Sequence, residues 1–195
     1  MPPRVSSALV VAALVALAGG AAAIAYGRWS RPFVVATEAA AHGDTAGALR
    51  AYAEGDARFR RFPSAARLLR DYRARLAHNQ LALLYRSGQY DAVLEQAEHA
   101  PPSSAPDFWA GCAFFAKSRR EERADSRILW LGRAEEAFKR ALQGAPDDWD
   151  AKYNYELSAR LAAALRRDAE KKPVTLIPLL RPQPSAGRQP VKKVG

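Results

Sequence analysis

The feature that most constrains this chain is a run of 23 residues near its start, Val5–Gly27, which contains no charged side chain. A helix of this length can cross a hydrocarbon core about 30 Å thick. Arg4 precedes the run, and Tyr26, Arg28 and Trp29 mark its end, a combination typical of a membrane boundary. The run therefore predicts a membrane-spanning helix.

A cleaved signal peptide is the alternative interpretation of this run. Ala21, Ala22 and Ala23 fit a small-residue cleavage site, but the run exceeds the ~7–15 apolar residues of a signal peptide. We favour an uncleaved anchor that holds the chain in the inner membrane by a single pass. Arg4 on one side and Arg28 on the other leave the orientation open. We expect a periplasmic domain, because an N-terminal anchor usually sends a larger following domain outward.

The residues after the anchor have the composition and periodicity of packed helices. Ala, Leu and Arg dominate, and this mixture favours helices over strands. Turn signals lie at Gly43 and Gly88, Pro63 is expected to end a helix, and Ser64 can cap the next one. Helices are expected over residues 34–42, 45–62, 64–87, 90–99, 107–118, 126–143 and 147–170. We therefore expect an all-α fold with three parts: the anchor (1–32), a helical domain (33–170) and a basic, Pro-rich, disordered tail (171–195).

One stretch of the helical domain has a specific spacing of small and aromatic residues. Ala134, Phe138, Ala141 and Pro146 follow the pattern Ala-x3-Phe-x2-Ala-x4-Pro. This stretch resembles the second helix of a tetratricopeptide repeat, and residues 79–93 and 41–52 are similar to the first helix and its glycine turn. The resemblance implies a short right-handed solenoid of three irregular helix pairs and a C-terminal capping helix. The third pair departs from the pattern, because residues 106–118 lack the usual Leu-Gly and Tyr spacing.

A second resemblance rests on residues 146–157, PDDWDAKYNYEL. This segment resembles one in small membrane-anchored repeat proteins encoded beside MoxR-type AAA ATPases and von Willebrand A-domain proteins. Within that group the chain is similar to the MxaK family of methanol oxidation accessory proteins. The resemblance implies an adaptor that assists maturation of periplasmic methanol dehydrogenase, at the loading of calcium. The implied partners are the ATPase, the A-domain proteins or the client dehydrogenase.

The repeat resemblance also implies a partner-binding face. In such repeats the first helix of each pair lines a concave surface, and a mid-helix Asn grips the backbone of a bound peptide. Asn79 and Asn154 fall at that position. The alternative is that both side chains satisfy helix ends or solvent. The expected partner-binding residues are Arg75, His78, Asn79, Arg86, Tyr153 and Asn154.

The sequence contains no pattern of a known catalytic or metal site. His42, His78 and His99 are far apart without helical pairing, and the single cysteine, Cys112, lies in an apolar run that favours a buried side chain. Residues 147–150 include three aspartates. These supply fewer oxygens than calcium prefers, and the favoured explanation is an acidic helix start. We expect no enzymatic activity and no bound cofactor.

The formal charge of +10 does not by itself indicate nucleic-acid binding. Six basic residues follow Glu170 and an arginine cluster covers residues 58–75, but neither run is interleaved with the aromatic residues that stack on bases. We expect no nucleic acid. The arginine cluster is open to three interpretations: contact with anionic lipid, contact with an acidic partner, or a solvated surface. In the tail, residues 175–180 (TLIPLL) offer a short docking ligand as the alternative to disorder.

Two other functions remain open at this level. The chain can be a structural tetratricopeptide-repeat subunit of an envelope complex, such as a secretion or pilus machine, with permanent contacts to its neighbours. It can also be an enzyme of unknown type, which requires a polar pocket that the sequence does not reveal.

Overall fold

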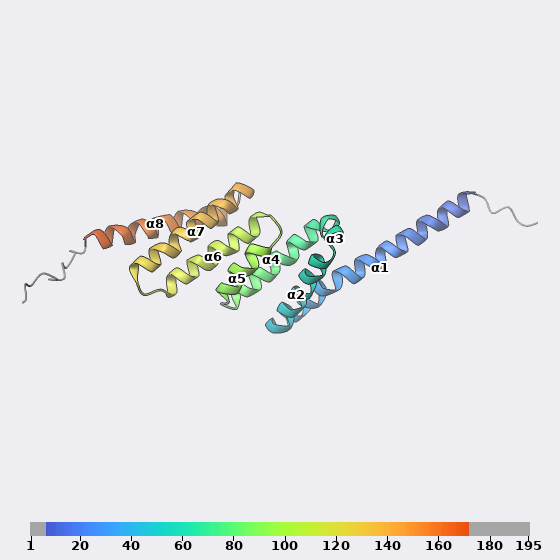
Figure 1. Cartoon of the computed structure of the whole chain (residues 1–195), viewed down its shortest axis with the longest axis horizontal. Helices are drawn as coiled ribbons and strands as arrows, with labels where there is room; N and C mark the ends of the chain where they lie inside the picture. The colour runs from blue at the N-terminus through green and yellow to red at the C-terminus, as the bar shows by residue number, and fades with distance from the viewer. Residues whose placement is uncertain (1–6, 172–195) are drawn as a thin grey trace, which may run out of the picture.

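The computed structural model describes residues 7–171, and the chain forms eight helices and no strand in that range (Figure 1). The expected all-helical fold is thereby confirmed. The expected tail, residues 171–195, lies outside the described part except for its first residue. The helices are α1 (Ser7–Ala41), α2 (Thr45–Arg61), α3 (Pro63–Leu68), α4 (Arg70–Arg86), α5 (Tyr90–His99), α6 (Ser104–Arg120), α7 (Ala124–Gly144) and α8 (Trp149–Lys171).

The anchor and the first helix of the body form one continuous helix, α1 (Figure 1). The segment Leu9–Ala41 is long and apolar enough to span a membrane. Its apolar side chains up to Tyr26 are exposed, and packing against the body begins at Trp29. The expected boundary at residue 32 therefore falls inside α1.

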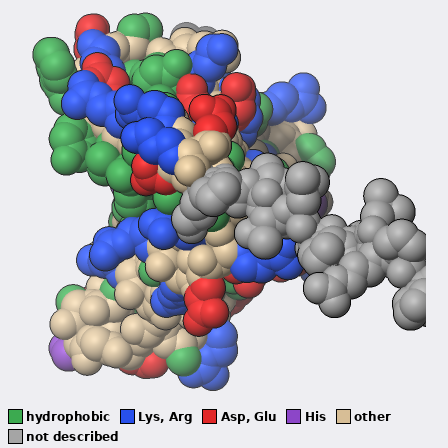
Figure 2. Space-filling model, turned by 90° about the vertical axis from the view of Figure 1, so that its left-hand side faces the viewer, with side chains coloured by type: hydrophobic (Ala, Val, Ile, Leu, Met, Phe, Trp, Pro, Cys, Tyr) green, Lys and Arg blue, Asp and Glu red, His purple; other side chains and the backbone are tan. Residues whose placement is uncertain are grey.

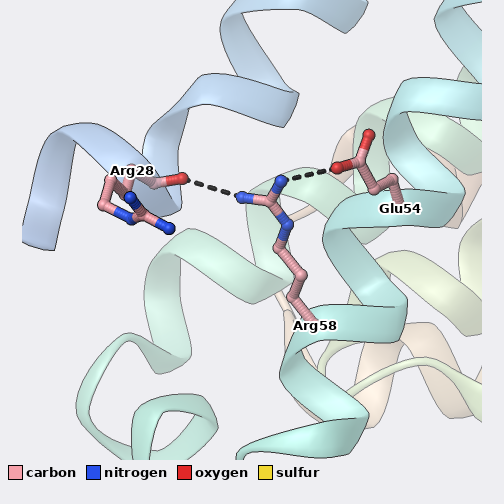
Figure 3. A network of polar contacts seen from close by, with 3 residues as sticks. All are labelled: Arg28, Glu54 and Arg58. Carbon is pink, nitrogen blue, oxygen red and sulfur yellow. Dashed lines mark hydrogen bonds and ion pairs between the residues drawn. The ribbon is translucent and has the colours of Figure 1, made fainter.

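A proline lies inside α1 at the point where the helix meets the body. Pro32 has no N–H group, so the backbone oxygen of Arg28, four residues earlier, lacks its usual helical donor. Figure 3 shows that Arg58 on α2 points at this oxygen and donates a hydrogen bond to it over 2.9 Å. The same guanidinium pairs with Glu54 at 2.5 Å. A side chain of α2 thus satisfies the group that the proline leaves open.

Successive helices pack as antiparallel neighbours in a row. α1 packs on α2, α4 on α5, α6 on α7, and α8 closes the row against α7 (Figure 1). Each pair contacts the next through α2 with α4 and α5 with α6. This order is consistent with the expected row of helical hairpins.

Small residues line the helix interfaces, as the alanine-rich sequence suggests. Ala36, Ala48, Tyr52, Phe59 and Leu76 form a buried cluster between α1, α2 and α4. A second cluster joins α4, α5 and α6, and a third set of buried residues lies along α7. The second cluster is Leu81, Leu84, Val93 and Ala113; the α7 set includes Ala134, Ala137, Phe138 and Ala141.

The turns before α2 and α5 follow the sequence signals. Gly43 and Gly88 adopt positive φ angles of 79° and 75°, a region in which glycine has no steric penalty.

Asp44 caps α2 by accepting a hydrogen bond from the Gly47 N–H at 2.8 Å. Asp148 caps α8 in the same way, because its carboxylate accepts from the Ala151 N–H at 3.0 Å. The acidic residues before α8 therefore include a helix cap, as the favoured explanation requires.

The segment after α2 differs from the expectation. A single helix over residues 64–87 was expected; instead α3 ends at Leu68, and α4 begins at Arg70. Ser64 does not cap α3, because the helix already begins at Pro63, whose ring suits the first helical position. The break at Leu69 lets that side chain pack on the first cluster while Leu68 points to solvent, 85% exposed.

Candidate partner-binding surface

The four expected residues of α4 follow one stripe of that helix. Arg75, Asn79 and Arg86 are four and seven residues apart, and His78 borders them, a spacing that places side chains on one side of a helix. Arg75, His78 and Arg86 are exposed and Asn79 is half-buried. Among the described residues, no atom forms a hydrogen bond with the Asn79 amide, so both its donors and its acceptor are available to a partner.

Trp109 on α6 connects this stripe to the next helix of the row. Its indole Nε1 donates to His78 Nδ1 over 3.4 Å, a long hydrogen bond, and the two rings lie 5.7 Å apart. Tyr85 of α4 packs on the same indole with a centroid distance of 5.5 Å. The aromatic group of α6 therefore extends the α4 stripe without a gap.

Cys112 continues the surface from α6 toward α8. It lies three residues after Trp109, so both share one side of α6. Burial, followed by the negative charges of Asp150 and Asp148, raises the pKa of the Cys112 thiol to about 12. α6 and α8 contact one another, and the two carboxylates at the start of α8 act on the thiol across this contact. The thiol is half-buried, and is therefore less covered than the buried side chain that was expected.

The two expected residues of α8 differ in how available they are. Tyr153 is 67% exposed. The Asn154 amide nitrogen donates to the backbone oxygen of Asp150 over 2.8 Å, within its own helix. The Asn154 side-chain nitrogen therefore satisfies its own helix, as the alternative interpretation holds. Among the described residues, no group donates a hydrogen bond to the Asn154 side-chain oxygen. Trp149 adds an aromatic side chain that is 78% exposed, with the Lys152 ammonium 4.7 Å from its ring centroid.

The structure thus places the six expected residues in two groups on α4 and α8, with α6 between them. Trp109 and Cys112, which the sequence interpretation did not assign to the site, bridge the groups. No local sequence pattern assigns Trp109 to this surface, because its place beside His78 depends on the packing of α6 against α4. We name the surface formed by the α4 stripe, Trp109, Cys112 and the first turns of α8 the inner stripe.

The inner stripe changes its charge along the row. Arg75, His78 and Arg86 supply basic groups on α4, whereas Asp148 and Asp150 make the start of α8 acidic. Seen from the α8 end, Figure 2 shows acidic and basic side chains interspersed, with hydrophobic side chains gathered on part of the face. Within residues 7–171, no three His, Cys, Asp or Glu side chains gather in a group that could hold a metal ion.

Comparisons with known proteins give no relative for this chain: no family model, curated protein or solved structure matches it significantly.

Proposed function

We propose that this chain is a membrane-anchored adaptor that holds partner proteins along its inner stripe. The observation that carries the proposal is the continuity of that stripe across three helices, through the His78–Trp109 contact and the packing of α6 against α8. Exposed aromatic rings and an available Asn79 amide are suited to an extended peptide, because rings bury area and the amide donates and accepts at once. The opposite charges at the two ends favour one direction of binding.

The client of the adaptor follows from the sequence resemblance. The similarity of residues 146–157 to the MxaK family supports a role in maturation of periplasmic methanol dehydrogenase, with a MoxR-type ATPase and von Willebrand A-domain proteins as partners. In that role the chain positions proteins during calcium loading and binds no metal itself. α1, which is long and apolar enough to span a membrane, supports a single inner-membrane pass. The periplasmic side of the body is part of the proposal and follows from the role in dehydrogenase maturation.

The orientation is tested by fusing alkaline phosphatase, which is active only in the periplasm, after Gly195. A fluorescent protein that folds only in the cytoplasm is the matched fusion. A periplasmic body gives active phosphatase and no fluorescence, and the reverse pair of results rejects this orientation.

The client is tested by deleting the gene and purifying the dehydrogenase from the deletion strain. We expect the enzyme polypeptide at its normal level, with less bound calcium and little activity. Restoring the wild-type gene should recover both quantities. Normal calcium content and activity in the deletion strain would reject the proposed client.

The binding surface is tested by complementing that strain with an Asn79→Ala/Tyr153→Ala double variant. Both side chains lie on the inner stripe and neither is buried, so the variant should fold and still fail to restore activity. Leu129→Ala, at a 53% exposed position on α7, is the matched control and should complement fully. Full complementation by the double variant would place the partner on another surface.

A structural subunit of an envelope complex is the second candidate, favoured by the apolar side chains left exposed at the end of the row. Leu129 on α7 and Leu161 on α8 are 53% and 40% exposed, and a permanent neighbour would cover them. Co-purification separates the candidates. A fixed ratio to envelope proteins supports the subunit, whereas recovery that varies with the state of the client supports the adaptor.

A further inference from the structure

The short helix α3 exposes two large apolar side chains beside the membrane anchor. Leu68 is 85% exposed, Phe62 just before the helix is 51% exposed, and no residue of α3 is buried. Ala65 and Ala66 are partly covered, and Ala66 packs against the first cluster, but the burial of such small side chains stabilises this short helix little. Exposed apolar groups of this size indicate a contact with another molecule or with the membrane, which would also stabilise the helix.

Contacts with α1 hold this corner at the level where the anchor leaves its apolar stretch. The Phe62 ring packs edge-on against Trp29 at 5.9 Å. The Tyr72 hydroxyl, just after α3, donates to the backbone oxygen of Ser30 over 3.1 Å. Leu68 and Tyr26 line the same depression between α3 and α1.

The depth of α3 relative to the bilayer follows from these contacts. The charge-free run of α1 ends at Gly27, and Tyr26 and Trp29 are the aromatic residues expected at the headgroup level. Because α1 continues without a break into the body, α3 is held beside that level. The figure of the whole chain agrees, since α3 lies at the end of the body from which the apolar part of α1 extends (Figure 1).

Basic side chains surround the apolar pair. Residues 58–75 hold seven arginines and a single acidic residue, Asp71. Arg61, Arg67 and Arg70 are exposed, and within residues 7–171 the first two have no ion pair. Arg67 and Arg70 line depressions on both sides of α3, the larger about 560 Å³ in volume.

We propose that α3 lies in the headgroup layer of the membrane that α1 spans. Phe62 and Leu68 enter the boundary between headgroups and acyl chains, as the apolar face of an interfacial helix does. Arg61, Arg67 and Arg70 bind the phosphates of anionic phospholipids, because the guanidinium group matches phosphate oxygens in pairs. An acidic protein would explain the arginines alone, whereas the membrane explains the arginines, the apolar pair and their depth together.

This second attachment limits how the body moves. A single helix lets the row of helices rotate about α1 and tilt against the bilayer, whereas contact at α3 fixes both motions. The inner stripe is then presented at a constant height above the membrane. The inference does not depend on which partner that stripe binds.

The test measures the depth of a nitroxide label on the full chain in phospholipid vesicles. The label is attached at Leu68→Cys in a Cys112→Ala background, with Leu129→Cys on α7 as the remote control. Accessibility to oxygen, which concentrates in the bilayer, is compared with accessibility to a water-soluble nickel chelate. Vesicles are made of phosphatidylcholine with and without phosphatidylglycerol.

We expect the Leu68 label to favour oxygen in vesicles that contain phosphatidylglycerol and the Leu129 label to favour the chelate. In an Arg61→Gln/Arg67→Gln/Arg70→Gln variant, the ratio of membrane-inserted to water-exposed Leu68 label should fall by at least about tenfold. Each arginine near an anionic surface strengthens the membrane-binding equilibrium by roughly fivefold. An Arg119→Gln/Arg123→Gln/Arg166→Gln variant, with the same change in net charge at exposed remote positions, should leave the label in place.

Three results would overturn the inference. A Leu68 label as open to the chelate as the Leu129 label rejects membrane contact. Equal depth with and without phosphatidylglycerol rejects recognition of anionic lipid. An equal shift in both triple variants shows that net charge, and not the position of the α3 arginines, determines the depth.

Discussion

Arg58 on α2 donates a hydrogen bond of 2.9 Å to the backbone oxygen of Arg28 on α1. Pro32 deprives that oxygen of its helical donor, and an interior proline usually kinks or ends a helix at a cost of about 3 kcal/mol. Here α1 continues to Ala41, because the neighbouring helix supplies the missing hydrogen bond. The junction between anchor and body is thus a tertiary contact as well as a covalent one.

Replacing Arg58 should therefore destabilise the protein more when the proline is present than when it is absent. We expect Arg58→Met to lower the free energy of unfolding by about 1 kcal/mol, a value reduced from that of buried charged hydrogen bonds because the side chain is partly exposed. In a Pro32→Ala background the backbone N–H at position 32 can bond the Arg28 oxygen, and the same substitution should cost less. Urea unfolding in detergent, followed by circular dichroism, measures this double-mutant cycle. Equal costs in both backgrounds would contradict the interpretation.

The third helix pair is held by a close approach of α6 to α7. A Cβ atom placed on Gly111 would lie 2.7 Å from Cε1 of the Phe138 ring, which is closer than two non-bonded carbon atoms can approach. Phe138 is fully buried, so its ring has little room to move.

We expect Gly111→Ala to destabilise the protein by about 1–3 kcal/mol, the usual cost of adding a carbon to a packed core. Gly132→Ala on α7 is the matched control, because a Cβ atom there meets nothing within 4 Å. That change should stabilise the helix by about 0.5–1 kcal/mol through its propensity alone. The two thermal midpoints should therefore move in opposite directions; a common direction would reject the packing argument.

The sequence identified most helices because their ends carry local signals. Gly43 and Gly88 both adopt the positive φ that their position as turn residues implied. The helix before Pro63 ends at Arg61, because the proline ring disfavours the helical conformation in the residue just before it, Phe62. Such signals depend on one residue and its neighbours, so they can be recognised without the rest of the fold.

The predictions from sequence were wrong or incomplete where contacts between residues distant in the sequence determine a helix boundary or a surface. The anchor was expected to end at residue 32 and a separate helix to begin at residue 34, whereas α1 continues through Pro32, where Arg58 donates to the Arg28 oxygen. The break at Leu69 has no proline or glycine to mark it, and its side chain packs against the first cluster, a contact that local sequence does not reveal. In the inner stripe, the position of Asn79 followed from helical spacing, but the role of Trp109 required knowing that α6 lies beside His78.

Asp56 on α2 carries a buried charge that joins two helices. Its side chain is 6% exposed and pairs with Arg60 on the same helix and with Arg73 on α4, the latter at 3.7 Å. Asp56→Ala leaves the mostly buried Arg73 without its partner, so we expect a loss of about 2–3 kcal/mol. The Asp56→Leu/Arg73→Met double variant should recover most of it, because apolar pairs replace buried ion pairs at little cost. A double variant less stable than Asp56→Ala, by urea unfolding, would contradict this account.

Cys112 should react slowly with alkylating reagents in the folded protein. Only the thiolate is nucleophilic, and burial together with Asp150 and Asp148 raises the thiol pKa from 9.0 to about 12. At pH 8 the thiolate fraction, and with it the rate of reaction with iodoacetamide, should be about 10³-fold lower than in the urea-unfolded chain. The rate should keep rising as the pH increases past 9, where an ordinary thiol levels off. Asp148→Asn/Asp150→Asn should raise the rate at pH 8, since it removes two negative charges that oppose ionisation; a rate that levels off near pH 9 in the folded protein would show that the thiol is not held in this environment.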